Sequence, residues 1–246
     1  MRLDDQDSTK PDVHSSTAEY RQRFAGPVGD WFVETQQNLV KEMLTKQGSG
    51  PLKVVEFGGG HAQNLAPLLA SGFEVTVTGS DESCFELIRE DNLSEAISSV
   101  VTDLCNASFA DASFDAVLSF RMLAHLGDWQ AHVKELCRVS NGYVLVEFPN
   151  KRSVNVLADR MFAIKKGVET NTRQYLLFDL AEVTHFFTQQ GFELVRVEGQ
   201  YVLPMALHRL LKWVSLSRFL ERVFGVLFSP RRFGSPLVCL FKKAAD

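Results

Sequence analysis

The sequence has few of the features that mark secreted or thiolate-zinc proteins. Its four cysteines stand far apart without a Cys-x-x-Cys pair, which argues against a disulfide framework and against a thiolate zinc site. Residues 1–17 are polar and contain no apolar stretch of the kind that signal peptides need, so we interpret them as a loose tail. We therefore expect reduced thiols and a cytoplasmic location.

The sequence also has no excess of basic charge and no histidine cluster. It carries 26 Lys and Arg against 30 Asp and Glu, a net charge of -4. This balance disfavours a whole-domain nucleic-acid surface, although a local basic patch stays open. The six histidines are scattered and form no His-Glu-x-x-His motif. We predict neither a nucleic-acid partner nor a bound metal.

What the sequence does contain is an alternation of short apolar runs and helical patterns. Apolar runs separated by segments long enough for a crossover are typical of buried parallel strands in a doubly wound α/β sheet. Seven strands are predicted, at residues 52–57, 73–77, 99–102, 114–120, 143–148, 192–197 and 237–241. Helical spacing predicts one helix over residues 31–44, with Gln36 on its polar side, and another over residues 153–166.

Length alone would allow one large domain or two small ones. The strand and helix pattern favours a single domain over residues 18–246, with a mostly parallel seven-stranded sheet. We expect residues 50–150 to form its ligand-binding core. Helical additions are expected at the N-terminus and after the fifth strand, where residues 151–235 would lie on the substrate side.

The stretch VVEFGGGHAQN places three glycines directly after the first predicted strand. Open α/β sheets bind ligands at this edge, and glycine lets a ligand approach the backbone closely. A tight strand-to-helix turn without a ligand is the alternative. A dinucleotide fingerprint would need a small residue where Gln63 stands, which disfavours a nicotinamide oxidoreductase. No Lys-Ser or Lys-Thr follows the glycines, so a phosphate-binding loop for nucleoside triphosphates is absent.

This stretch resembles the first motif of class I S-adenosylmethionine-dependent methyltransferases, in particular the type 11-like small-molecule methyltransferases. That motif is an acid followed by Gly-x-Gly-x-Gly, here with Ala62 in place of the last glycine. Asp81 follows 25 positions after Glu56, and VVTDLCNASFADASFDAVLSF matches the family's later segments. The likeness covers residues 54–150, while the rest of the chain agrees only in outline.

The resemblance implies S-adenosyl-L-methionine as the cofactor and assigns residues to it. Asp81 would bind the ribose hydroxyls, and Asp103 with Leu104 would contact the adenine. The remaining expected cofactor residues come from the first loop and the end of the fourth strand: Glu56, Gly58, Gly59, Gly60, Ala62 and Phe120. Local structure offers alternatives, since Asp81 can be a helix N-cap and Asp103 the first residue of an Asx-turn. Glu56 can serve to order the loop.

Methyl transfer from a sulfonium needs alignment and a dry pocket more than a catalytic group. A hydroxyl acceptor benefits from a base, and His125, after the fourth predicted strand, is the best-placed candidate. Holding a loop is its alternative role. Arg121 could bind an acidic group of the substrate, with an ordinary salt bridge as the alternative.

Residues 205–228 read as an amphipathic helical segment that charge interrupts too often for a membrane span. His208, Lys212, Ser215 and Arg222 fall on one face, and Leu210, Trp213, Val214, Leu220 and Phe224 fall largely on another. Such a segment can lie on a membrane surface, cover a hydrophobic acceptor, or pack its apolar side on the sheet.

Two functional classes remain open. The favoured one is an enzyme that transfers a methyl group from S-adenosylmethionine to oxygen, nitrogen or carbon of a small molecule, for example a hydrophobic or glycan-linked one. The other is a catalytically silent methyltransferase fold that binds the cofactor or a protein partner. The sequence leaves the acceptor and the oligomeric state undetermined.

Overall fold

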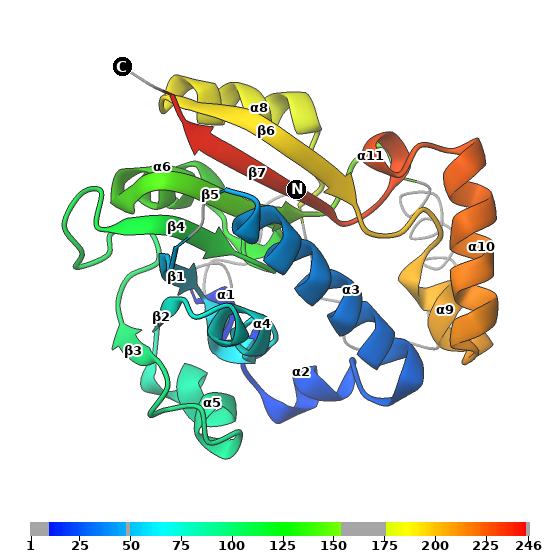
Figure 1. The fold of residues 1–246 in the computed structure, drawn as a ribbon, viewed down its shortest axis with the longest axis horizontal. Helices are drawn as coiled ribbons and strands as arrows, with labels where there is room; N and C mark the ends of the chain where they lie inside the picture. Colours follow the sequence, from blue (N-terminus) through cyan, green and yellow to red (C-terminus); the bar gives the residue numbers. More distant parts are fainter. Residues whose placement is uncertain (1–9, 48–49, 154–175, 245–246) are drawn as a thin grey trace.

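The protein folds around one seven-stranded sheet with helices on both faces (Figure 1). The structure is a computed structural model and describes residues 10–47, 50–153 and 176–244. Strand order is β3-β2-β1-β4-β5-β7-β6, with β7 antiparallel to both of its neighbours and all other pairs parallel. The strands are β1 (Lys53–Phe57), β2 (Glu74–Gly79), β3 (Ser98–Val101), β4 (Phe114–Ser119), β5 (Ser140–Phe148), β6 (Phe192–Gly199) and β7 (Leu237–Lys243). All seven predicted strands and the predicted fold class are confirmed.

The helices divide between the two faces of the sheet and its edges. In the described part they are α1 (Pro11–Ser15), α2 (Ala18–Gln22), α3 (Gly26–Thr45), α4 (Leu65–Ala70), α5 (Glu86–Glu90), α6 (Trp129–Val139), α8 (Leu180–Gln189), α9 (Met205–Leu211), α10 (Val214–Leu227) and α11 (Pro230–Phe233), with single 3-10 turns η1 (Gly59–His61), η2 (Glu82–Phe85) and η3 (Leu123–His125). None of these helices has the length and apolar composition needed to cross a bilayer.

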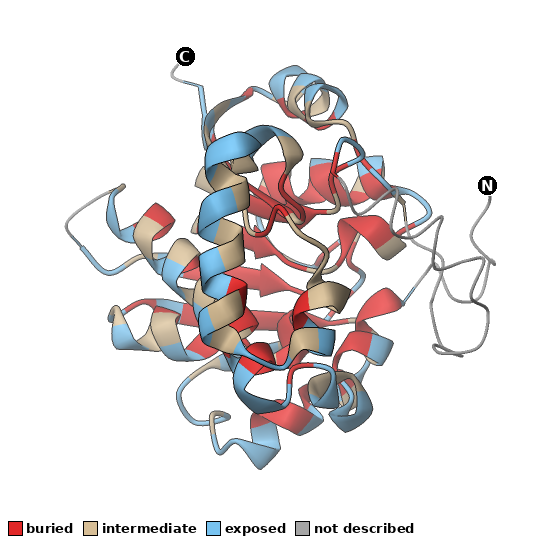
Figure 2. Cartoon of the chain, turned by 90° about the vertical axis from the view of Figure 1, so that its right-hand side faces the viewer, coloured by how far each residue is buried: buried red, intermediate tan, exposed pale blue. Residues whose placement is uncertain are grey.

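Two hydrophobic clusters form the core, one on each face, and Figure 2 shows the strands buried between them. Alternate residues of one strand enter opposite clusters, because successive side chains of a strand point to opposite faces. Val55 and Phe57 join the cluster under α6 and α8, whereas Val54 joins the cluster under α3 and α4. The sheet is therefore covered on both faces, as expected for buried parallel strands.

Three expectations outside the sheet need correction or stay open. Residues 10–17, predicted to be part of a loose tail, contain helix α1 with a fully buried Asp12, and residues 1–9 lie outside the described part. The helix predicted at 153–166 also falls outside the described residues, apart from Ser153. Residues 205–228 form two helices instead of one, because Lys212 adopts a left-handed conformation with φ 52°. The proposed domain boundaries stay predictions.

Candidate functional site

The glycine loop turns the chain sharply at the carboxyl end of β1. Gly58 has φ 69°, and Ala62, which ends η1, has φ 59°, so the loop begins and ends in left-handed backbone. A side chain at Gly58 would collide with Met122, and one at Gly60 would collide with the Cys84 carbonyl and Ser16 Oγ. The glycines are therefore needed for packing within the protein itself, whatever a ligand adds.

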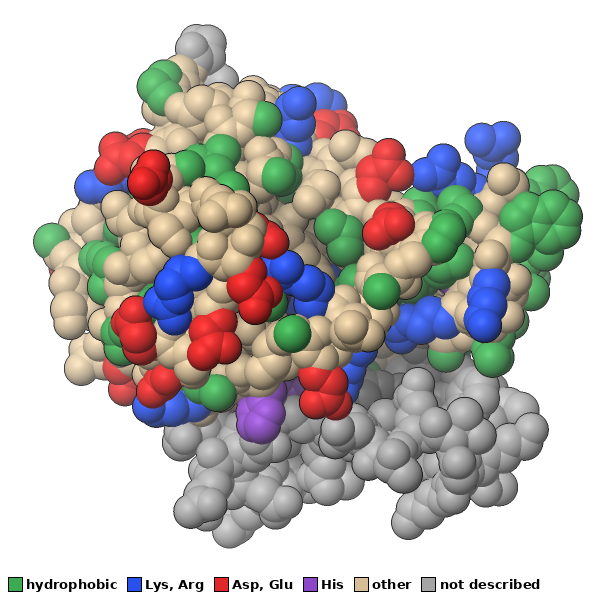
Figure 3. Space-filling model, turned by 90° about the horizontal axis from the view of Figure 1, so that it is seen from below, with side chains coloured by type: hydrophobic (Ala, Val, Ile, Leu, Met, Phe, Trp, Pro, Cys, Tyr) green, Lys and Arg blue, Asp and Glu red, His purple; other side chains and the backbone are tan. Residues whose placement is uncertain are grey.

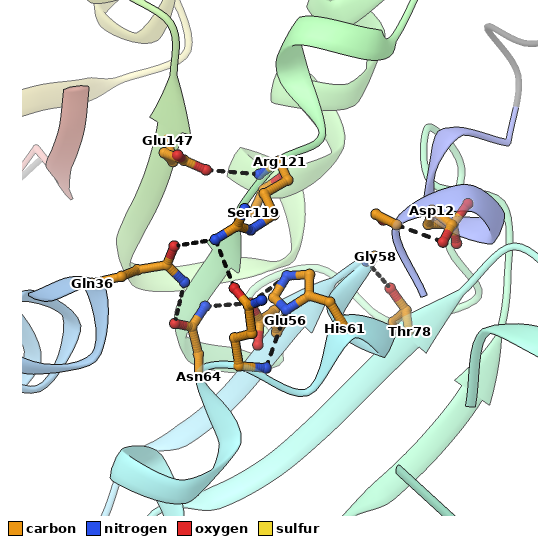
Figure 4. Close-up of polar contacts among 12 residues, drawn as sticks. Asp12, Gln36, Glu56, Gly58, His61, Asn64, Thr78, Ser119, Arg121 and Glu147 are labelled. Atoms are coloured by element: carbon orange, nitrogen blue, oxygen red, sulfur yellow. Dashed lines mark hydrogen bonds and ion pairs between the residues drawn. The ribbon is translucent and has the colours of Figure 1, made fainter. Parts of the chain in front are cut away.

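A continuous set of buried hydrogen bonds leads from this loop to α3 (Figure 4). Asn64 Nδ2 donates to Glu56 Oε1 at 2.6 Å, and Gln36 Nε2 donates to Asn64 Oδ1 at 2.7 Å. Arg121 Nη2 then donates to Gln36 Oε1 at 2.9 Å and to Gln63 Oε1 at 2.6 Å. These bonds hold the loop, α3 and the end of β4 in one arrangement. Gln36, expected on the polar side of its helix, is only 1% exposed.

Arg121, predicted as a substrate ligand, is largely engaged by the protein. Besides Gln36 and Gln63, its guanidinium donates to the Tyr20 hydroxyl at 3.2 Å and stacks 4.2 Å from the centre of the Phe24 ring. Its backbone N–H donates to Glu147 Oε2 at 3.0 Å. Arg121 also adopts φ 62°, an uncommon conformation for a non-glycine residue. The side chain thus joins the N-terminal helices to the end of β4.

Burial shifts the pKa values of Glu56, Glu147 and His61, which lie around this network. Burial raises the pKa of Glu56 to about 8, against a hydrogen bond from Asn64 that lowers it. Burial lowers the pKa of His61 to about 3, and it raises the pKa of Glu147. At neutral pH, Glu56 is therefore mostly protonated and His61 is neutral, because removing a charge from water is costly.

Several buried polar atoms near the loop have no hydrogen-bond partner among the described residues, and Glu56 Oε2 and His61 Nε2 are two of them. An unpaired buried acceptor costs about 1–3 kcal/mol. Glu56 Oε2 could be satisfied by a cationic or N–H-bearing group at the end of β1. The amino group and the sulfonium of S-adenosylmethionine have this character, so the residues present fit that cofactor.

The two acids expected to hold the nucleoside lie at the ends of the neighbouring strands. Asp81 follows β2, is exposed, and accepts hydrogen bonds from the Ser83 amide (3.0 Å) and hydroxyl (2.8 Å), both on Oδ1. These bonds lower its pKa. Asp103 follows β3 and accepts from the Cys105 amide at 2.7 Å. Both acids therefore make the local cap or turn contacts that the sequence also allowed, while their carboxylates remain at the surface.

Helix α1 packs onto this edge through Asp12. The Asp12 carboxylate accepts from the amide and the hydroxyl of Ser80, each at 2.6 Å, and lies 3.4 Å from Cys84 Sγ. Ser80 directly precedes Asp81, so α1 fixes the backbone next to the expected ribose ligand. Sequence reasoning missed this contact because it placed Asp12 in the tail.

Of the other predicted site residues, Leu104 and Phe120 have buried side chains, and Phe120 belongs to the core under α3 and α4. A cofactor would meet Phe120 through its backbone. His125 ends η3, after β4, and is partly buried. His132, not predicted as a site residue, is buried: its Nδ1 lies 2.7 Å from the Leu104 carbonyl and its Nε2 lies 2.8 Å from Ser119 Oγ. Burial lowers its pKa to about 4, so it is neutral.

The residues that sequence reasoning missed share one signal. Asn64 and Glu147 are polar residues that stand at the edges of apolar stretches. A polar residue at such a position is buried together with its apolar neighbours, and a buried polar group needs a hydrogen-bond partner. The pattern could mark them as buried, yet it could not say what they contact. No group of three or more His, Cys, Asp or Glu that could hold a metal is found in the described part of the chain.

Comparisons with known proteins show which protein family and which solved structures this chain resembles. A family model described as "Methyltransferase domain" matches residues 55–146, and no curated protein matches the chain. Magnesium protoporphyrin IX methyltransferase from Synechocystis PCC 6803, solved with bound SAH and with bound SAM, is 16% identical; the SAH complex aligns over 95% of this chain and 97% of that one with a TM-score of 0.66.

Other solved structures share the fold with different descriptions. A complex between the Haloferax volcanii Trm112 methyltransferase activator and a protein described as a methyltransferase matches at 15% identity, over 96% and 99% of the two chains, with a TM-score of 0.65. The [4+2]-cyclase SpnF matches at 14% identity, over 84% and 80%, with a TM-score of 0.56. Identities this low show a shared fold alone. Residues 55–146 therefore match a methyltransferase domain, the chain as a whole has the fold of class I S-adenosylmethionine-dependent methyltransferases, and both findings support S-adenosyl-L-methionine as the cofactor.

Proposed function

We propose that this protein transfers a methyl group from S-adenosyl-L-methionine to oxygen, nitrogen or carbon of a small-molecule acceptor. The observation that supports this most is the order of three acids: Glu56, Asp81 and Asp103 stand at the carboxyl ends of the adjacent strands β1, β2 and β3. Parallel strands bring their carboxyl ends to one edge of the sheet, which is where open α/β proteins bind ligands.

Each acid suits one part of the cofactor. Asp81 can accept two hydrogen bonds from the ribose diol, and Asp103 with Leu104 would contact the adenine, as in the family the chain resembles. The loop from Gly58 to Ala62 would hold the methionine end. Glu56 would favour the positive charge there, because a nearby cation stabilises the ionised carboxylate that burial otherwise opposes.

When bound, the cofactor supplies an electrophilic methyl group. In the transfer, a lone pair of the acceptor would bond to the methyl carbon, and the electron pair of the carbon–sulfur bond would stay on sulfur. The acceptor then loses a proton if it was a hydroxyl or an amine. We assign His125 as the base for a hydroxyl acceptor, since it lies just past β4 on the turn that closes this edge. The rest of the rate enhancement comes from aligning the acceptor atom with the methyl group in a pocket that excludes water.

The acceptor pocket is proposed to be formed by the additions to the core, the N-terminal helices and residues 151–235. The network of Arg121, Tyr20 and Gln36 already fixes α2 and α3 against the end of β4. A small hydrophobic or glycan-linked molecule fits this arrangement better than nucleic acid, because the chain has a net charge of -4.

Calorimetry with S-adenosylhomocysteine and with NAD tests the cofactor assignment. We expect the wild type to bind S-adenosylhomocysteine and not NAD. Asp81→Ala should weaken that binding by at least about 100-fold, since each charge-assisted hydrogen bond contributes roughly 1.5–3 kcal/mol. Asp81→Asn keeps the cap to Ser83 but removes the charge, so it separates cofactor binding from the local fold.

Glu82→Ala is the matched control, since it removes the same charge one residue further along an exposed turn. If Asp81→Ala and Glu82→Ala bound S-adenosylhomocysteine with equal affinity, the assigned role of Asp81 would be wrong. Transfer of a labelled methyl group to a small-molecule extract then separates an enzyme from the silent alternative: the silent fold would bind the cofactor tightly and label nothing.

A further inference from the structure

The outward side of α9 and α10 carries large apolar side chains in contact with water. Trp213 is 62% exposed and Val226 is 83% exposed. Seven residues make up this surface, which we name the outer face: Leu210, Trp213, Phe219, Val223, Val226, Leu227 and Phe228. They are the majority of the exposed large hydrophobic residues in the described part, so the exposure is concentrated here. Figure 2 shows α10 with its outward side exposed, and Figure 3 shows hydrophobic side chains gathered at this end of the molecule beside Lys and Arg.

Helix α10 is apolar on two sides, and the protein covers only one of them. Ser217 is buried and Phe224 is partly buried on the side that faces α3. Phe219, Val223 and Val226 recur at i, i+4 and i+7 and form a second stripe that points away from the protein. Of the three alternatives for this segment, packing of the apolar side on the sheet does not hold for Leu210 and Trp213, which lie at the surface.

Within the segment that carries the outer face, the exposed charges are all positive. Glu221 is the only acid between residues 205 and 233. It is turned inward, where it accepts from the Val202 amide at 2.8 Å, the Leu203 amide at 2.9 Å and His208 Nε2 at 2.8 Å. His208, expected on the polar face, is fully buried by this contact. The only acid of the segment therefore contributes nothing to the outer face.

The lysine and arginine residues of the same segment are exposed, although Arg209 also lies over the Phe32 ring, 5.6 Å from its centre. Lys212 and Arg222 are exposed and have no ion pair within the described part of the chain. Arg218 pairs with Glu34 at 2.9 Å, and Arg231 pairs with Glu198 at 3.1 Å. An apolar stripe flanked by unpaired cations lies on a chain whose net charge is negative, so the positive charge is local to this surface.

We propose that the outer face of α9 and α10 binds the surface of an anionic lipid bilayer, with both helices lying in the interfacial plane. The apolar stripe would enter the boundary between headgroups and acyl chains, Lys212 and Arg222 would meet anionic headgroups, and Trp213 would sit at headgroup depth. A two-fold contact with a second copy fits less well, because an isologous interface would bring Arg218 and Arg222 of both copies together. The inference does not depend on methyl transfer.

Tryptophan fluorescence can test this proposal, because Trp213 lies on the outer face and the other tryptophans are buried. The chain has three tryptophans, and Trp31 and Trp129 are buried at 8% and 6% exposure. A change in tryptophan emission on membrane binding would therefore report on Trp213. Mixing the full-length protein with phosphatidylcholine vesicles that contain about 30% phosphatidylserine should shift its emission to the blue, and the protein should sediment with the vesicles. Trp213→Phe should lose the emission shift and retain most of the sedimentation.

Two variants separate the charge from the apolar stripe. Lys212→Gln with Arg222→Gln should lower vesicle partitioning about 25-fold, since each basic residue near an anionic surface contributes about 1 kcal/mol, or about five-fold. Val226→Asp should abolish binding. Its matched control is Val195→Asp on β6, outside the outer face, where the valine is 50% exposed. Raising salt from about 0.1 M to about 1 M should weaken binding, because the screening length falls from about 10 Å to about 3 Å.

Three results would overturn the proposal. Equal binding to pure phosphatidylcholine would remove the role of anionic lipid. Equal loss of binding in the Val195→Asp control would remove the role of the outer face. A concentration-dependent dimer in analytical ultracentrifugation, with the Trp213 emission already blue-shifted in the absence of vesicles, would assign the outer face to a second copy of the chain.

Discussion

Glu56 is a buried acid that should leave a measurable signature in the pH dependence of stability. Its native pKa is about 8, while an unfolded glutamate titrates near 4.5. Between these values the native state holds a proton that the unfolded state has released, so the free energy of unfolding falls as pH rises, by about 1.4 kcal/mol per pH unit. The cause is burial, which disfavours the charged carboxylate.

Two histidines restrict the useful pH range. His61 and His132 have native pKa values of about 3 and about 4, whereas an unfolded histidine titrates near 6.5. Below pH 6.5 the unfolded state binds protons at these positions that the native state does not, and stability rises with pH. Their contribution opposes that of Glu56 in this range. Their contribution is complete only above about pH 7.5, but it is the same in the wild type and in a variant of Glu56, so the difference between the two proteins isolates the slope from Glu56.

The test compares wild type with Glu56→Gln by urea denaturation at several pH values. Glutamine keeps an acceptor for Asn64 Nδ2 and does not titrate. Over pH 6.5 to 8 the variant should therefore gain about 1.6 kcal/mol relative to the wild type, slightly less than the product of 1.5 pH units and about 1.4 kcal/mol, because Glu56 itself is half ionised at about pH 8. The difference between the two proteins cancels the contribution of Glu147, which both retain.

Glu42→Gln is the matched control. Hydrogen bonds and ion pairs with Lys46 and Arg196 lower the pKa of Glu42 to about 2, so this carboxylate is ionised in both states throughout the range. Its stability difference from the wild type should stay constant between pH 6.5 and 8. A constant difference for Glu56→Gln as well would show that Glu56 is ionised in the native protein, and the argument from burial would be wrong.

Two further substitutions test residues whose expected and observed roles differ. Arg121→Met should cost about 3 kcal/mol and lower Tm by roughly 6–12 °C, because it leaves Gln36, Gln63 and Tyr20 without a buried donor; an unchanged Tm with a raised acceptor KM would restore the role of a substrate ligand. His125→Gln should lower kcat by about 10²–10⁴-fold for a hydroxyl acceptor and leave the affinity for S-adenosylhomocysteine unchanged; equal turnover by both proteins would leave His125 a loop residue.

The sequence by itself determined the fold class and the identity of the cofactor. Apolar runs such as residues 52–57 and 114–120 are buried on both sides in a parallel sheet, and that burial leaves a pattern that can be read locally. The acid and glycines of residues 56–60 are close in sequence, so one motif describes the whole first loop. The ends of the second and third strands are also visible locally, and Asp81 and Asp103 stand there as predicted; their roles as cofactor ligands stay predictions.

Tertiary structure alone decided which polar residues are buried together. Glu56, Asn64, Gln36 and Arg121 come from four separate elements, and no local pattern states that their side chains meet. Arg121 was expected to face a substrate, yet its Nη1 donates to Tyr20, 101 positions away, and its Nη2 donates to Gln36. Long-range contacts of this kind depend on how the helices pack across the sheet.

The same reason explains why the sequence misjudged residues 10–17 and left residues 205–228 open. Residues 10–17 read as a loose polar tail because Asp12 looks like a solvated acid until the Ser80 amide and hydroxyl, 68 positions away, are placed against it. Residues 205–228 read as one amphipathic helix with two faces, and the sequence could not say which face the protein covers. Glu221 and His208 pair on the inner side, and this packing leaves Trp213 and Phe219 in the solvent. Hydrophobic periodicity shows that a face exists, whereas only the folded chain shows what lies against it.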